Sequence, residues 1–445
     1  MRTGIMALEE LNTEEGNTPE VTDFVDAPET EMLQAEEASG ELARHEDSVD
    51  EAAQVADTVE AVADRVGETI PEGGLSEPEA AAVEVAVEHM LQRVGFSAKK
   101  SKVAALESFK DVASRKVATE SMVENVRAKA KQIWEAIVAA LSKAWEWIKN
   151  LLDFSGKAAA KTVARAEQLK AAAEKSDAKG GDKIAGESLL VEGGKALSGS
   201  ALVKAYGQHV SSNVVKVDRL DHAKKVYGEI KPITAKADPK AWDDAAMIIS
   251  TRPLEFLDLQ NEGAKKVEKP DFSLSEGQEA FEVKLAIGDV SLFTVVSSGQ
   301  KDTGVVARLT GFGASKSFIG KSTGAKGGET GEHLSASAKE AIALAEEVAG
   351  HMKTYEGLSG KITSVENESK AVLSEIKKFS NGQDEAAVQC LREASGVLRG
   401  ATNVLVTGSA QLRKFDIQLA NQVLSYAAKS IKAPAAQKSE DKKAA

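Results

Sequence analysis

The spacing of apolar residues along the chain predicts its secondary structure. Large apolar side chains are sparse before residue 76, recur every three or four residues over 77–178 and 335–432, and alternate with polar ones between 231 and 330. A period of three to four is typical of an amphipathic helix, and alternation is typical of a half-buried strand. The pattern predicts a mainly α protein with elongated helices and a small mixed α/β region in the middle.

Residues 77–178 are predicted to form helices. One covers 77–95 and ends at Gly95, because glycine often terminates a helix. The next begins near Ser121, is interrupted at Gly156, and continues to 178 as an Ala/Lys/Glu-rich helix with little to bury. Its apolar seam alternates by four and three residues: Trp134, Val138, Leu141, Trp145, Ile148 and Leu152.

This Trp-rich seam has two interpretations. It packs against neighbouring helices of the same chain, or it is an amphipathic surface that docks a partner or touches a membrane. The lysines that flank it are compatible with both.

The middle of the chain, residues 179–330, changes character. Glycines are frequent over 179–200, which predicts a linker with short hairpin-like strands such as Ser188–Val191. Alternating residues predict strands at 281–287, 290–296 and 305–309. The glycines between 311 and 328 predict a flexible basic loop.

Residues 331–432 are predicted to form an antiparallel helical hairpin. A first helix covers 335–378 and breaks near Gly357 and Gly360, and Asn381-Gly382 supplies the turn. Gly396, Gly400 and Gly408 then mark close helix contacts in the returning helix. That helix has an apolar residue every seventh position: Leu391, Leu398, Leu405, Leu412, Leu419 and Tyr426.

The charge is distributed unevenly. The net charge of −13 divides into −18 for residues 1–120, with 10 Lys+Arg and 28 Asp+Glu, and +5 for the remainder. The first 75 residues are acidic with few large apolar side chains, which predicts a disordered N-terminus that could contain short helices, for example around residues 48–66. It is either a solubilising tail or a propeptide that masks the basic body. The domain boundaries expected are 1–107, 108–178, 179–330, 331–432 and a disordered tail at 433–445.

The sequence offers little for catalysis or cofactor binding. Gly320-Lys321-Ser322-Thr323 is similar to the end of a phosphate-binding loop, but the glycine required five residues earlier is Ser315. The single cysteine, Cys390, is expected in the core, and no histidine pair has helical metal spacing. No apolar run approaches a membrane span of about 18 residues, so no stable membrane insertion is expected. We therefore predict a non-enzymatic protein without catalytic residues, cofactor or metal.

Two Ala-x-Glu motifs lie at the charge boundary. Ala105-Leu106-Glu107 is followed by Ser108, and Ala118-Thr119-Glu120 is followed by Ser121. Cutting after Glu120 would separate a segment with a net charge of −18 from a body with a net charge of +5. Cutting after Glu107 would release a segment with a net charge of −19, which contains 7 basic and 26 acidic residues. It would leave a body with a net charge of +6.

This layout resembles the internal head proteins of phiKZ-like giant tailed phages. The resemblance extends loosely over the chain, and its specific motifs lie in residues 105–152, which include Ile-Trp-Glu-Ala-Ile at 133–137 and Trp-Glu-Trp-Ile at 145–148. It implies that a prohead protease cuts after the glutamate of an Ala-x-Glu motif. Glu107 and Glu120 are then the candidate sites, with Ser108 or Ser121 as the new N-terminus, and Glu9 is a weaker candidate.

The resemblance further implies a location inside the capsid with the packaged DNA, and for some members ejection into the host cytoplasm. Weak, non-specific contact with DNA is expected, because a body of +5 is only mildly basic. Other head proteins and further copies of the chain are the remaining expected partners. Two alternatives stay open: a prohead core or scaffolding protein, and a bacterial coiled-coil adaptor that uses its Trp-rich helix.

Overall fold

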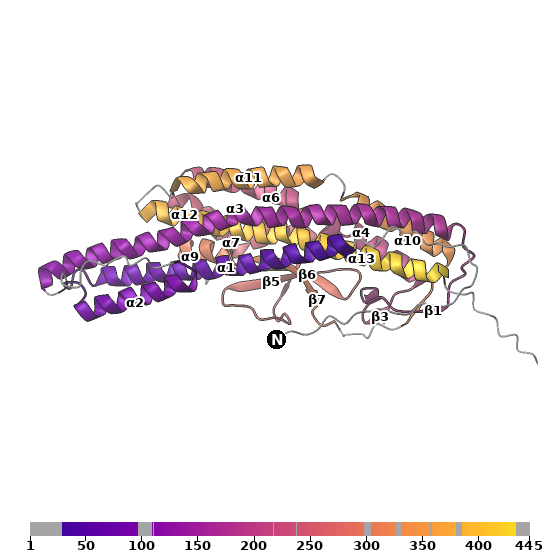
Figure 1. Ribbon diagram of the computed structural model, residues 1–445, viewed down its shortest axis with the longest axis horizontal. Helices are drawn as coiled ribbons and strands as arrows, with labels where there is room; N and C mark the ends of the chain where they lie inside the picture. The colour runs from indigo at the N-terminus through magenta and orange to yellow at the C-terminus, as the bar shows by residue number, and fades with distance from the viewer. Residues whose placement is uncertain are drawn as a thin grey trace, which may run out of the picture.

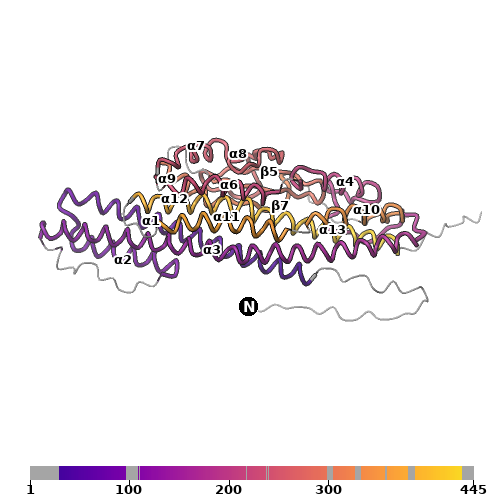
Figure 2. Tube along the Cα trace, turned by 90° about the horizontal axis from the view of Figure 1, so that it is seen from above, coloured from indigo at the N-terminus to yellow at the C-terminus, as the bar shows by residue number. Residues whose placement is uncertain are grey.

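The molecule is elongated, and one helix runs along almost its entire length (Figure 1). That helix is α3 (Val112–Ala173). Figure 2 shows α1 and α3 along one long side and α7 and α8 on the opposite side. This computed structural model describes residues 29–96, 109, 111–216, 218–236, 238–297, 304–325, 332–355, 358–379 and 385–432. The helical fold class predicted from the sequence is confirmed.

The acidic segment from residue 29 onward is a helix, which corrects the expectation of disorder there. α1 (Glu29–Glu68) makes its most extensive contact with α3. Its buried stripe is made mainly of alanine and valine: Ala35, Ala38, Leu42, Val49, Ala53, Ala56, Val59, Ala63 and Val66. Small side chains let two helices approach closely, and packing of such a stripe stabilises a helix that is not stable alone. Residues 1–28 lie outside the described residues.

The helix predicted at 77–95 is confirmed as α2 (Glu77–Arg93), which Gly95 follows with φ +75°. α3 begins earlier than expected, at Val112, because the Asp111 side chain caps it by accepting a hydrogen bond from the Ser114 N–H. α3 also continues through Gly156 without interruption. The prediction that the helix after Gly156 has little to bury is wrong, since Ala159, Val163 and other small residues there are buried beneath α10.

Short elements occupy the region after α3. β2 and β3 form a hairpin whose turn residues Gly193 and Gly194 both have positive φ, and β1 pairs with the distant strand β8 (His333–Leu334). The elements in order are β1 (Lys183–Ile184), β2 (Val191–Glu192), β3 (Lys195–Ala196), α4 (Gly199–Ser211), α5 (Asn213–Lys216), α6 (Arg219–Ala235), η2 (Pro239–Trp242), α7 (Asp243–Thr251), α8 (Pro253–Phe256) and η3 (Gln260–Glu262).

A four-stranded antiparallel sheet follows, with its strands in sequence order. It contains β4 (Lys265–Val267), β5 (Gln278–Lys284), β6 (Val290–Ser297) and β7 (Lys316–Lys321). The strand predicted at 290–296 is confirmed as β6, whereas the strand predicted at 281–287 lies three residues earlier, as β5, and residues 285–287 follow it outside the sheet. The strand predicted at 305–309 is wrong, because α9 (Val305–Phe312) packs there against α12. A short apolar run does not distinguish a strand from a buried helix. Part of the expected basic loop is strand β7.

The predicted C-terminal helical hairpin is confirmed. α10 (Ala338–Lys353) packs against α13 (Gly408–Lys432), and α11 (Leu358–Phe379) packs against α12 (Glu385–Ala401). Between α12 and α13 lies η4 (Thr402–Thr407), a π-helical segment. All six heptad residues from Leu391 to Tyr426 are buried, and so is Cys390.

The hydrophobic core has two sections along α3. Residues of α3 up to Leu152 join the first section with α1, α6 and α12, and residues from Ala158 join the second with α4, α10 and α13. The N-terminal acidic helix is therefore part of the same core as the C-terminal hairpin.

Candidate functional site

The acidic helix α1 lies in antiparallel register against the helix formed by α12, η4 and α13. From Asp57 back to Glu36 along α1, the contacted residues advance from Arg392 to Lys414. Between these ends, Ser39 accepts a hydrogen bond from Gln411 at 2.9 Å. α1 carries 13 acidic and 2 basic residues, a net charge of −11. It therefore presents a strongly negative helix to this part of the body.

The contacts combine carboxylates of α1 with cations of the body. We call Glu36, Glu46, Asp50, Asp57 and Glu60 the carboxylate row, and Arg392, Arg399 and Lys414 the basic row. The distances are 2.7 Å from Asp57 Oδ1 to Arg392 Nη2, 3.5 Å from Asp50 Oδ1 to Arg399 Nη2, and 3.7 Å from Glu36 Oε1 to Lys414 Nζ. Glu60 also pairs with Arg392, and Glu46 accepts a hydrogen bond from Thr407 at 3.2 Å.

Burial shapes the electrostatics of this interface. It raises the pKa of Glu46 to about 7 and the pKa of Glu60 to about 7, and it raises the pKa values of Asp50 and Asp57 as well. Burial likewise lowers the pKa of Arg399. The loss of hydration thus offsets much of the attraction between the rows. The extensive packing of α1 against α3 therefore contributes to holding α1 in place beside these partly offset charge contacts.

A cleft lies beside these rows, between α1 and the four-stranded sheet. Its volume is about 1550 Å³ including its open mouth. Asp50 and Asp57 line one wall, and Arg392, Arg399 and Lys316 line others. The cleft gives solvent and mobile ions access to the edge of the interface.

The predicted cleavage sites fall in different surroundings. Glu107 and Ser108 lie outside the described residues, in the part of the sequence that joins α2 to α3. Glu120 and Ser121 lie within α3, nine and ten residues into its sequence range. The neighbouring Thr119 is fully buried, and its Oγ1 accepts a hydrogen bond from the Leu75 N–H at 2.9 Å.

The Trp-rich seam is part of the protein core. Trp134, Val138, Leu141, Trp145, Ile148 and Leu152 have exposed fractions between 0 and 9%. Trp145 also donates a hydrogen bond from Nε1 to Ser369 at 2.7 Å. In this conformation the seam has no free surface for a partner or a membrane, so the structure favours packing within the chain.

The loop-like motif at 320–323 contacts a carboxylate. The Thr323 N–H donates to Glu282 Oε1 at 2.8 Å, and the Ser291 hydroxyl donates to the same oxygen at 2.7 Å. Glu282 thus occupies donors that a phosphate would need, which argues against nucleotide binding here.

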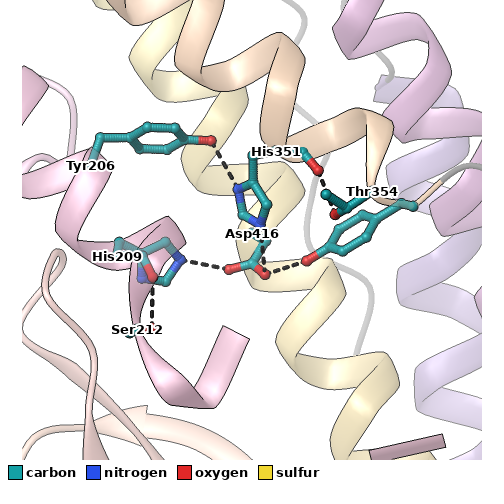
Figure 3. Close-up of polar contacts among 7 residues, drawn as sticks. Tyr206, His209, Ser212, His351, Thr354 and Asp416 are labelled. Atoms are coloured by element: carbon teal, nitrogen blue, oxygen red, sulfur yellow. Dashed lines mark hydrogen bonds and ion pairs between the residues drawn. The ribbon is translucent and has the colours of Figure 1, made fainter. Parts of the chain in front are cut away.

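A buried polar cluster joins histidines that sequence analysis could not connect (Figure 3). Asp416 lies 2.8 Å from His209 Nε2 and 3.6 Å from His351 Nε2, and it accepts a hydrogen bond from Tyr355. Tyr206 bonds His351 Nδ1 at 3.2 Å. Burial alone would raise the pKa of Asp416, but the hydrogen bond from His209 and the nearby imidazoles outweigh it and lower that pKa. These residues come from α4, α10 and α13 and the turn after α10, and no spacing rule relates them.

The part of the chain that the structure describes has neither a candidate metal cluster nor a candidate membrane span. No group of three or more His, Cys, Asp or Glu side chains there could hold a metal ion. None of the helices there is long and apolar enough to cross a membrane.

Comparison with known proteins gives one match. Residues 28–436 match the family model of phiKZ-like phage internal head proteins. No curated protein and no solved structure matches the chain.

Proposed function

Because the chain belongs to the phiKZ-like phage internal head proteins, and so to the interior of a phage capsid, we propose that it is matured by cleavage between Glu107 and Ser108. In this proposal it is a non-enzymatic structural protein. A prohead protease separates residues 1–107, of charge −19, from a body of charge +6.

The position of Glu120 in α3 supports Glu107 as the cleavage site. A protease commonly binds its substrate as an extended strand, so the bond after Glu120 becomes accessible only if the first turns of α3 unfold. Unfolding those turns would also expose Thr119 and break its hydrogen bond with Leu75. The bond after Glu107 precedes α3, so binding it as an extended strand displaces the buried Phe109, whose carbonyl accepts a hydrogen bond from Arg115, but leaves the turns around Glu120 folded.

Cleavage changes how α1 is held. In the intact chain α1 docks within the same molecule, at a high effective concentration. After cleavage its docking is bimolecular, and DNA phosphates compete with the carboxylate row for the basic row. The contact between the body and DNA is weak, because the net charge of the body is only +6. It is independent of DNA sequence, because it is made to phosphates. Other head proteins and further copies of the chain are the remaining partners in the proposal.

Mass spectrometry of purified phage particles tests the cleavage. We expect peptides that begin at Ser108 without a protease used in sample preparation, together with peptides that cross the Glu120–Ser121 bond intact. Abundant peptides crossing the Glu107–Ser108 bond in mature particles would contradict the proposal, although membership of the family would stand.

The same particles distinguish the neighbouring hypotheses. A scaffolding protein would be absent from mature particles, whereas an internal protein is present and truncated. Ejection into the host cytoplasm predicts the truncated form in infected cells in which new translation has been blocked. The bacterial adaptor hypothesis loses its basis, since the family is a phage family and the Trp-rich seam is buried.

A further inference from the structure

A second pocket lies on the body, away from α1. It is bounded by the end of α4, by α5, by the turn after α10 and by the start of α13, and its volume is about 770 Å³ including its open mouth. The side chains of Lys216, Arg219 and Arg413 line it, and Asp218 is the carboxylate among its lining residues. The pocket is thus richer in cations than in anions.

Two of these charges are already satisfied within the protein. Arg219 donates two hydrogen bonds to Glu262, at 2.7 and 2.6 Å. Asp218 accepts hydrogen bonds from Lys361 Nζ at 2.7 Å and from the Leu220 N–H at 3.0 Å. Neither group needs a further partner, which leaves Arg413 and Lys216 as the cations that a ligand can use.

Arg413 is a buried cation with an unused donor. Its side chain is 8% exposed, and Nη2 lies 3.5 Å from Asp218 Oδ1, beyond hydrogen-bonding geometry for a strong pair. Nη1 is buried and makes no hydrogen bond with the described residues. The Tyr355 ring, 5.5 Å from the guanidinium carbon, fixes the side chain from one side. A buried guanidinium with a vacant donor favours a bound anion.

His351 forms part of the wall of the same pocket. Its Nδ1 shares a hydrogen bond with the Tyr206 hydroxyl at 3.2 Å, and its Nε2 faces Asp416 Oδ2 at 3.6 Å, so Arg413 and Lys216 remain the groups that a ligand can use. Burial lowers the pKa of His351 despite the neighbouring Asp416 carboxylate. Figure 3 shows how Tyr206 and Asp416 hold this ring from two sides.

We propose that this pocket binds a phosphate group, with Arg413 as its main ligand and Lys216 at its mouth. The forked donors of arginine match a phosphate oxygen pair, and a lysine adds a point charge for a dianion. The side chains of Val210, Val215 and Leu412 also line the pocket. They leave room for an uncharged part of the ligand, so a nucleoside monophosphate fits the site as well as inorganic phosphate does.

Thermal unfolding and isothermal titration of the full chain test the site. Inorganic phosphate and deoxyadenosine monophosphate are compared with sodium chloride at equal ionic strength, because a ligand that binds only the native state raises the melting temperature. We expect at least one phosphate ligand to bind and to raise it. Tighter binding of the nucleotide would identify the apolar wall as part of the site. An equal response to chloride and to both phosphates would overturn the proposal.

Substitutions assign the binding to the pocket. We expect Arg413→Gln to weaken phosphate binding about tenfold or more, because a charge-assisted hydrogen bond is lost. Arg252→Gln is the matched control: Arg252 is 60% exposed, pairs with Glu255 and does not line the pocket. Unchanged affinity in Arg413→Gln would overturn the proposal. If circular dichroism shows that this variant is unfolded, the exposed Lys216→Gln takes its place, and unchanged affinity there would be equally decisive.

Discussion

Arg219 donates a hydrogen bond from Nη1 to the backbone carbonyl of Val404 at 2.9 Å. Val404 lies in the π-helical segment η4, where the widened turn disturbs the regular α-helical hydrogen bonds. The guanidinium of Arg219, 1% exposed, supplies a donor to this segment from α6. The charge it brings into the core is compensated by Glu262, which is itself 3% exposed. The π turn, α6 and the short helix η3 are thereby joined by one buried ion pair.

Removing the charge of Glu262 should destabilise the protein strongly. In Glu262→Gln, Arg219 remains buried without a counter-ion, and we expect a loss of about 3 kcal/mol in the free energy of unfolding. Urea unfolding followed by circular dichroism measures it. The control is Glu255→Gln, which removes the exposed partner of Arg252 and should cost less than about 1 kcal/mol. Equal effects of the two substitutions would show that the buried pair does not stabilise the fold.

Glycines on α12 should be intolerant of a methyl group. A Cβ at Gly396 would overlap the Leu309 carbonyl oxygen, and a Cβ at Gly400 would overlap that of Phe312, both on α9. We expect Gly396→Ala and Gly400→Ala each to destabilise the protein by about 1–3 kcal/mol, through displacement of α9. Gly350→Ala is the control within a helix, because a Cβ there meets nothing within 4 Å. It should be neutral or stabilising by about 0.5–1 kcal/mol. Thermal unfolding of the three variants measures these changes in stability.

Stability should depend on pH through Glu46. Its pKa is about 7 in the folded protein and near 4.5 when unfolded, so the folded state binds more protons between these values. Stability contributed by this group is therefore complete below pH 4.5, falls as pH rises to 7, and stays low above it. The fall is up to about 1.4 kcal/mol per pH unit.

Glu46→Gln isolates this effect, because glutamine resembles the protonated acid. Relative to the wild type, we expect the variant to gain stability as pH rises from 5 to 7 and to keep that gain at pH 8. Urea unfolding at four pH values measures the difference. Glu51→Gln, on the same helix at a side chain 47% exposed, should show no comparable pH-dependent gain. A constant difference between Glu46→Gln and the wild type would contradict the raised pKa.

Periodicity in the sequence predicted the C-terminal hairpin well because each heptad residue from Leu391 to Tyr426 is large and apolar. The same reasoning allowed only short helices around residues 48–66 where α1 lies, because the buried stripe of α1 depends on alanines such as Ala53 and Ala56. Alanine carries little hydrophobic signal, and its contribution appears only when a partner helix approaches closely. The disorder expected from acidic composition was wrong at 29–68 for this reason.

The candidate interface was predictable only in outline. The split between an acidic head and a basic body follows from counting charges, but the pairing of Asp57 with Arg392 spans 335 positions. Local spacing carries no information on such a pair. The same holds for His209 and Asp416, which are joined only by the packing of α4 on α13.

Glu107 and Glu120 should respond differently to substitution in an infecting phage. If the protein is matured as proposed, Glu107→Gln should block its maturation, so that particles retain residues before Ser108, because the proposed prohead protease recognises the glutamate of the Ala-x-Glu motif. Glu120→Gln is the matched control, since it changes the same residue type in the same motif. Glu120 lies within α3, where the backbone is helical and cannot be bound as an extended strand. This variant should leave the mature N-terminus at Ser108. Mass spectrometry of particles from both variants measures the outcome. A block in Glu120→Gln with normal processing in Glu107→Gln would reverse the assignment, and it would require the first turns of α3 to unfold in the prohead before the protease acts.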